Sequence, residues 1–147
     1  MELKYKILCL LGVSVILIYC LMTFISVSLF PSSFSPVDNW LSDLGNSSYN
    51  PNGAIFYNLG CILTGIALFP FFGSMVVWYR ENLWHKILAL IFNVKFNKLI
   101  SIYGYIVAFI NLLFVFISSI PLLEWFTVFS ALAFVGLIVF NTYSNFL

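Results

Sequence analysis

The sequence ILCLLGVSVILIYCLMTFISVSLF, residues 7–30, decides the class of fold. It contains fifteen Leu, Ile, Val and Phe residues and no charged side chain. Each such residue favours membrane insertion by roughly 0.3 to 0.6 kcal/mol at a helix centre, and a helix needs about 20 apolar residues to cross a bilayer. The run is too long for a signal-peptide core and ends without a small-residue cleavage site. We therefore predict a retained first transmembrane helix.

Further apolar runs of similar length follow at residues 54–78, 99–120 and 122–143. Of the 147 residues, 63% are hydrophobic and 7% are charged, whereas a soluble chain has about 25% charged residues. The sequence predicts an all-α, polytopic membrane protein: one domain, residues 1–147, with four transmembrane helices in an up-down bundle. Because Pro121 leaves only a short connection between the last two runs, these helices are expected to be antiparallel neighbours.

The basic residues fall on one side of the predicted membrane. They precede the first run or lie between the second and the third: Lys4, Lys6, Arg80, Lys86, Lys95 and Lys98. Since Lys and Arg are retained in cytoplasmic loops, both termini are predicted to be cytoplasmic, with the loop 31–52 outside a cell membrane. The chain has no concentrated basic face, so it is not expected to bind nucleic acid. For part of the inner segment, residues 83–92, two interpretations are open: a helix in the membrane interface, or an extension of a neighbouring span.

The sequence predicts neither a metal site nor a cofactor. Cys9, Cys20 and Cys61 all lie in predicted spans, where a thiol behaves as a small apolar group. His85 is the only histidine, and it has no Cys or acidic neighbour at ligand spacing. We predict that His85 lies at the level of the lipid headgroups.

Small and amide side chains within the runs predict where the helices contact one another. Small residues four positions apart share a helix face and favour close packing in a membrane; they are Gly60 with Thr64, Cys61 with Gly65, and Gly104 with Ala108. The amides of Asn58, Asn111 and Asn141 are costly to expose to lipid and should face the bundle interior. For Asn58, two interpretations are open: a structural hydrogen bond, or one wall of a polar cavity below the outer loop.

The outer loop contains the segment SPVDNWLSDLG, residues 35–45, which is predicted to form a short interfacial helix of two to three turns. Ser35 suits the N-cap, Pro36 the first helical position and Gly45 the helix end, and Asp38 would complete a capping box with Ser35. One face of this helix carries apolar residues and the other polar ones: Val37, Trp40, Leu41 and Leu44 against Asp38, Asn39, Ser42 and Asp43. The apolar face is expected to lie on the bilayer interface or on the bundle end, with Trp40 as its anchor.

The polar face of this segment is the candidate binding site. Asp38 has a capping role, but Asp43 would lie near a helix C-terminus, where a negative charge is mildly unfavourable. Another group is therefore expected to hold Asp43, with Tyr57, Asn58 or a bound headgroup as candidates. A structural role and a ligand-binding role for Asp43 both stay open. The candidate binding residues are Asp43, Trp40, Ser42, Asn39 and Asn58, and Asn46 of the triplet Asn46-Ser47-Ser48 is a candidate glycosylation site.

The stretches SPVDNWLSDLGN (35–46) and NPNGAIFYNLGCILTGI (50–66) resemble the N-terminal half of the domain-of-unknown-function 998 family of archaeal and bacterial membrane proteins, relatives of the Frag1/DRAM/Sfk1 group. The residues at matching positions are Ser42, Asp43, Leu44, Gly45, Asn52, Phe56, Asn58 and Gly60. The resemblance is specific over residues 35–65 and elsewhere is one of hydrophobicity. It implies a small helical membrane protein without established activity, commonly with a further pair of spans. This chain is then a short member or lacks that pair.

We expect a non-catalytic membrane module that binds membrane lipids or partner membrane helices, including a second copy of the chain. No catalytic residue is predicted, because no nucleophile, base and orienting group can be named together. The alternatives are an enzyme that modifies lipids or lipid-linked glycans at the outer face, and a small transporter subunit. A transporter is disfavoured because ion pathways usually contain ionisable residues within the spans, and none occur in the interiors of these runs.

Overall fold

The computed structural model describes residues 3–75, 97–117 and 120–146, and these ranges contain helices and no strand. The long helices are α1 (Leu3–Ser28), α2 (Ala54–Ser74), α5 (Lys98–Phe116) and α6 (Pro121–Phe146). All four are long and apolar enough to cross a membrane, which confirms the predicted all-α fold class. A short 3₁₀ helix, η1 (Leu41–Gly45), lies between α1 and α2. The segment 83–92, His85 and the end of the predicted span 54–78 lie outside the described residues.

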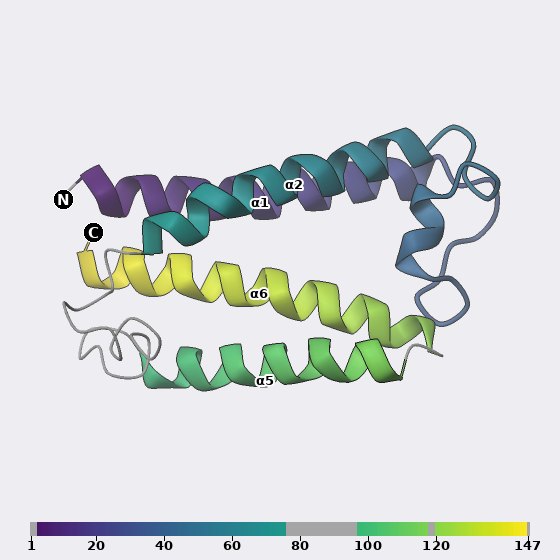
Figure 1. The fold of residues 1–147 in the computed structure, drawn as a ribbon. Coiled ribbons are helices and arrows are strands. Elements are labelled where there is room, and N and C mark those ends of the chain that lie inside the picture. The colour runs from purple at the N-terminus through teal and green to yellow at the C-terminus, as the bar shows by residue number, and fades with distance from the viewer. Residues whose placement is uncertain (1–2, 76–96, 118–119, 147) are drawn as a thin grey trace.

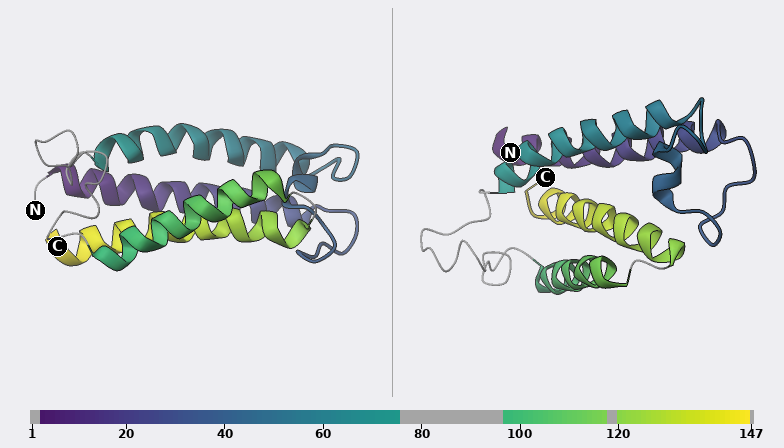
Figure 2. Two further views of the ribbon diagram at one scale, coloured as in Figure 1. Left: turned by 60° about the horizontal axis from the view of Figure 1, so that its bottom comes forward. Right: turned by 45° about the vertical axis from the view of Figure 1, so that its right-hand side comes forward.

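The four long helices pack as antiparallel neighbours. α1 packs against both α2 and α6, and α5 packs against α6 (Figure 1). The short connection around residues 117–121 joins α5 to α6, and these helices are antiparallel neighbours, as predicted. The same arrangement is seen from two other sides in Figure 2. The predicted up-down bundle is therefore confirmed.

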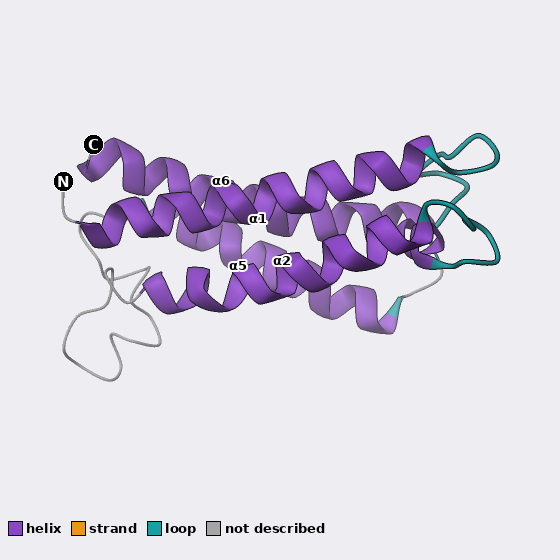
Figure 3. Ribbon diagram, turned by 90° about the horizontal axis from the view of Figure 1, so that it is seen from above, coloured by secondary structure: helices purple, strands orange, loops and turns teal. Residues whose placement is uncertain are grey.

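The two ends of the bundle differ in charge. Both chain termini and the start of α5 lie at one end, and the loop 29–53 lies at the other, which we call the loop end (Figures 1 and 3). The described basic residues, Lys4, Lys6 and Lys98, belong to the first end, and the acidic residues of the loop end are Asp38, Asp43 and Glu124. Arg80, Lys86 and Lys95 lie outside the described residues.

The core has two parts, one towards each end of the bundle. The cluster towards the termini joins all four long helices through Leu8, Val15, Phe71, Met75, Ile100, Val135 and Ile138. The cluster at the loop end consists of Tyr19, Leu41, Leu44 and Tyr57. Two of its members come from η1, so the loop contributes to the core of the bundle.

Amide side chains are less buried than predicted. Asn141 is buried, but Asn58 and Asn111 are exposed. The Asn111 amide donates a hydrogen bond of 2.8 Å to the Val107 carbonyl one turn back on its own helix. Asn111 also lines a hollow among the long helices, although its side chain is exposed. The expectation that all three amides face the interior is wrong for Asn58, which is exposed.

Two of the three predicted small-residue pairs mark helix contacts. A Cβ atom at Gly60 would lie 2.5 Å from the Met22 Cβ of α1, and one at Gly104 would collide with Phe134 of α6. In contrast, a Cβ at Gly65 would meet no atom within 4 Å. The pair of Cys61 with Gly65 therefore does not mark a contact within the described part of the bundle.

Gly60 and Gly65 both lie in α2 and provide a matched test of helix packing. Gly60→Ala should destabilise the protein by about 1 to 3 kcal/mol, because the new methyl group forces α1 and α2 apart. Gly65→Ala makes the same chemical change in open space and should leave stability unchanged or slightly raised. Thermal unfolding in a mild detergent, followed by circular dichroism, measures both. Equal melting temperatures for the two variants would contradict the assigned contact between α1 and α2.

Candidate functional site

The segment 35–45 forms two short pieces rather than one helix. Residues 35–39 form a single turn, in which the Asn39 N–H donates to the Ser35 carbonyl at 2.8 Å. Trp40 is extended, with φ −68° and ψ 143°, and η1 begins only at Leu41. The predicted helix of two to three turns is therefore wrong. Isolated helices of this length are marginal, and contacts to the rest of the bundle determine the local conformation instead.

Asn39 and Ser35 close the first turn through their side chains. The Ser35 N–H donates to Asn39 Oδ1 at 3.0 Å, and the Val37 N–H donates to Ser35 Oγ at 3.2 Å. Asn39 thus occupies the place that the sequence suggested for Asp38, and Asp38 is exposed. The predicted capping box between Ser35 and Asp38 is wrong by one residue, because the turn closes at Asn39.

Asp43 caps η1. Its Oδ2 accepts a hydrogen bond of 2.9 Å from the Trp40 N–H, and its own N–H donates to the Trp40 carbonyl at 3.1 Å. Because η1 begins at Leu41, Asp43 lies near a helix N-terminus, where a negative charge is favoured. Of the protein groups named as candidates to hold this carboxylate, neither Tyr57 nor Asn58 does so; the Trp40 backbone N–H holds it. Asp43 therefore has a local structural role.

The apolar side of the segment is divided between core and surface. Leu41 and Leu44 are fully buried against Tyr19 and Tyr57. Trp40 is half-buried and Val37 is 69% exposed. Two of the four predicted apolar residues thus anchor the loop on the bundle end, and Trp40 is not the main anchor.

Asn50 joins three parts of the loop end. It is fully buried, and its Nδ2 lies 2.9 Å from Ser26 Oγ, 3.1 Å from the Ser26 carbonyl and 3.1 Å from the Leu44 carbonyl. Its Oδ1 accepts from the Gly53 N–H at 3.1 Å, and its carbonyl accepts from the Ala54 N–H at 2.9 Å. One side chain therefore connects the end of α1, η1 and the start of α2. Asn50 is not among the residues predicted from the sequence, because no local pattern indicates that its amide meets Ser26 and Leu44.

Gly53 and Gly45 have no side chain, and this allows the Asn50 and Asn58 amides to approach the backbone closely. A Cβ at Gly53 would collide with the Asn50 amide and the Ser26 carbonyl, and a Cβ at Gly45 would lie 2.5 Å from Asn58 Oδ1. The Asn58 Nδ2 donates to the Gly45 carbonyl at 3.0 Å. Asn58 thus makes a structural hydrogen bond to η1.

The start of α6 holds the loop from the other side. The Ser42 N–H and Oγ both donate to Glu124 Oε2, at 3.2 and 3.4 Å. The Trp125 indole N–H donates to the Asn39 carbonyl at 3.0 Å. The Trp125 ring also lies between Phe34 and Phe129, with centroid distances of 5.6 and 5.8 Å. We call the Glu124 and Trp125 bonds the α6 clasp.

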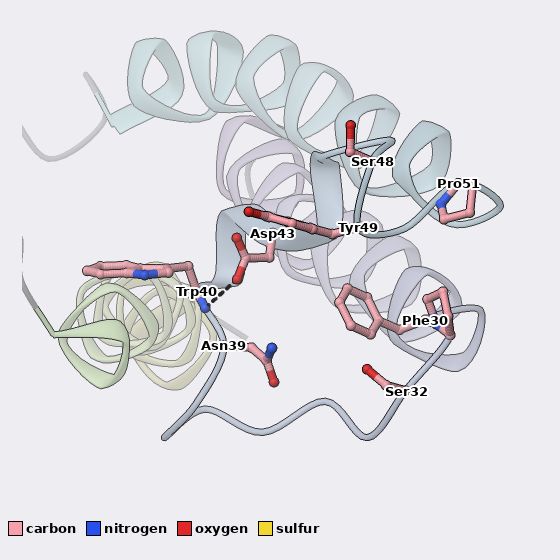
Figure 4. Close-up of a pocket in the computed structure, with 9 residues that line it drawn as sticks. Phe30, Ser32, Asn39, Trp40, Asp43, Ser48, Tyr49 and Pro51 are labelled. Carbon is pink, nitrogen blue, oxygen red and sulfur yellow. Dashed lines mark hydrogen bonds between the residues drawn. The ribbon is translucent and has the colours of Figure 1, made fainter.

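A cleft of about 560 Å³ opens between the two halves of the loop (Figure 4). Aromatic, polar and proline residues line it: Phe30, Pro31, Ser32, Asn39, Trp40, Asp43, Ser48, Tyr49 and Pro51. Asp43 is the only charged residue of this lining. Figure 4 shows the bond from the Trp40 N–H to the Asp43 carboxylate, which fixes the orientation of that carboxylate.

The cleft contains three of the five predicted binding residues. Asp43, Trp40 and Asn39 line it, whereas Ser42 is bonded to Glu124 and Asn58 to Gly45. Phe30 and Tyr49 also line the cleft and are absent from the predicted set. The signal that could have identified them is that aromatic residues at or near the end of a span are typical of the membrane–water interface. Asn46, the candidate glycosylation site, is exposed, and its Oδ1 accepts from the Ser48 N–H at 2.9 Å.

A second hollow, of about 450 Å³, lies among the long helices. Its lining is mostly apolar, with Tyr19, Thr64 and Asn111 as the polar exceptions. Within residues 3–75, 97–117 and 120–146, no three His, Cys, Asp or Glu side chains are grouped so as to hold a metal ion. The loop-end cleft is therefore the better candidate for a site that recognises a polar group.

Substitution of Asn50 tests the architecture of the loop end. Asn50→Ala leaves the Gly53 N–H without its side-chain acceptor and removes one of the two side-chain donors to the Leu44 carbonyl, the other being the Ser26 hydroxyl. The free energy of unfolding should therefore fall by about 2 kcal/mol or more. Asn52→Ala removes an exposed amide two residues away and should cost about 0.5 kcal/mol or less. Unfolding in detergent, followed by circular dichroism, measures the free energy of unfolding of both variants. If both variants were equally stable, Asn50 would not connect the loop end.

Comparison with known proteins gives no relative from which a function can be transferred. No model of a protein family, no curated protein and no solved structure matches the chain.

Proposed function

We propose that the chain is a non-catalytic, multi-pass membrane module that binds a membrane lipid at its loop end. Four helices of sufficient length and hydropathy support the membrane location. The observation that carries the proposal is the loop-end cleft, because it combines a fixed carboxylate, an amide, hydroxyl groups and aromatic rings in one hollow. Ligand sites of about 300 to 1,000 Å³ with a few placed polar groups are typical of proteins that bind small molecules.

The depth of the cleft in the membrane supports a lipid as its ligand. The cleft lies just beyond the ends of α1 and α2, where headgroups lie if these helices cross a bilayer of ordinary thickness. Aromatic side chains are enriched at this level. The distribution of Lys and Arg supports an orientation with the loop end outside the cell and both termini in the cytoplasm.

The resemblance to the domain-of-unknown-function 998 family is part of this proposal. Asp43 and Gly45, both at matching positions, have structural roles here: Asp43 caps η1, and Gly45 allows Asn58 to approach. These two matching positions therefore both contribute to the conformation of the loop end. The alternative to lipid binding is that partner helices or a second copy of the chain bind to the membrane-facing surface.

Blocking the cleft tests the proposal. Ser32 lines the cleft, and the neighbouring Ser33 is exposed outside it. Ser32→Trp should fill the hollow and reduce the amount of retained lipid by about tenfold, whereas Ser33→Trp adds the same side chain nearby and should retain as much lipid as the unmodified protein. Native mass spectrometry of protein purified in a mild detergent counts the bound lipids.

The same experiment separates the alternatives. Equal lipid retention by the two variants would contradict the proposal. If the protein converted the lipid into a product, and if this conversion required Asp43, the alternative of a lipid-modifying enzyme would be favoured. Co-purification of a second chain, lost in neither variant, would favour a partner-binding module.

A further inference from the structure

We propose that the loop-end cleft selects a ligand that carries an ammonium group, either the headgroup of a zwitterionic lipid or a free quaternary amine. This inference rests on the proposed function and adds the chemical class of the ligand. The charge around the cleft, the fixed orientation of its carboxylate and its aromatic lining each support it.

The charge around the cleft favours a cation. Asp43 is the only charged residue of the lining, and Asp38 and Glu124 add negative charge to the same end of the bundle. The described basic residues Lys4, Lys6 and Lys98 belong to the opposite end (Figure 1). An anionic headgroup in the cleft would meet a carboxylate and no neighbouring cation among the described residues. Like charges in one site repel each other, whereas opposite charges attract.

The Asp43 carboxylate is oriented for such a ligand. The Trp40 N–H bonds to Oδ2, while a carboxylate has about four lone-pair positions. After capping η1, the carboxylate therefore keeps negatively charged oxygen surface that can attract a cation in the cleft. It is half-buried in the cleft, so an ammonium group beside it is less screened by water than one on the open surface.

The aromatic residues of the cleft suit an ammonium group as well. Phe30 and Tyr49 belong to different loop segments and both line the hollow (Figure 4). The face of an aromatic ring attracts a cation through its quadrupole by about 0.5 to 2 kcal/mol, and such rings recognise quaternary ammonium ligands. A phosphate or a carboxylate gains nothing from these rings.

Binding titrations of the full chain in a non-ionic detergent test the inference. The probes are a short-chain phosphatidylcholine, a phosphatidylglycerol with the same acyl chains, and choline chloride, each followed by isothermal titration calorimetry. We expect the phosphatidylcholine to bind about tenfold more tightly than the phosphatidylglycerol. Binding of choline with comparable affinity identifies a free amine as sufficient, and binding of the lipid alone identifies the headgroup in its lipid; both results support the ammonium site.

Asp43→Asn is the informative variant, because Asn keeps an oxygen acceptor for the Trp40 N–H and removes the charge. It should weaken phosphatidylcholine binding by about tenfold and leave phosphatidylglycerol binding unchanged or improved. Asp38→Asn removes the same charge from an exposed residue outside the cleft and should change the ratio of the two affinities much less, because water screens a charge at that distance from the ligand. Tyr49→Leu, at a side chain that is 58% exposed, should weaken phosphatidylcholine binding by about two- to fivefold.

The failure of this inference differs from the failure of the proposed function. If the unmodified protein bound both lipids equally and Asp43→Asn changed neither affinity, the ammonium site would be refuted while lipid binding stood. If neither lipid bound, both would be refuted. Equal effects of Asp43→Asn and Asp38→Asn would also refute the site, because they would reflect the overall charge of the loop end.

Discussion

The structure of the loop end depends on one constraint, which is that backbone groups buried where α1, η1 and α2 meet need hydrogen-bond partners. Asn50 satisfies this constraint from a fully buried position, by bonding to Ser26, Leu44 and Gly53. A buried polar group left without a partner costs about 1 to 3 kcal/mol. Because the Asn50 amide fixes the end of η1, it also fixes the two leucines through which η1 closes the core.

The cleft follows from this arrangement. Asn50 holds the α2 side of the loop, and the α6 clasp holds Asn39 and Ser42 from the opposite side. The loop is therefore fixed on both sides of the hollow, and Asp43 lies in the hollow with its orientation set by Trp40. Capping and ligand binding are compatible roles for Asp43, because capping occupies only part of its acceptor capacity. A fixed carboxylate loses little conformational freedom when a ligand binds.

The sequence predicted the features that depend on composition and local pattern. The spans 7–30, 99–120 and 122–143 correspond to α1, α5 and α6 with ends displaced by a few residues. The predicted grouping of Lys4, Lys6 and Lys98 at one end also holds in the structure. The site was predicted only in part. Its decisive bonds join residues 24, 82 and 86 positions apart, namely Asn50 to Ser26, Ser42 to Glu124, and Trp125 to Asn39. Local periodicity cannot predict such bonds, and it therefore assigned one helix to residues 35–45.

Site-resolved hydrogen exchange of the backbone amides in detergent tests the central claim most directly. The Gly53 and Ala54 amides donate to Asn50, and the Trp40 amide donates to Asp43. Amides held in structure exchange only when it opens, so these three should exchange much more slowly than the amide of exposed Ser33 in the same loop. Exchange of Gly53, Ala54 and Trp40 as fast as that of Ser33 would show that the loop end is not held together in this way, and would contradict the account.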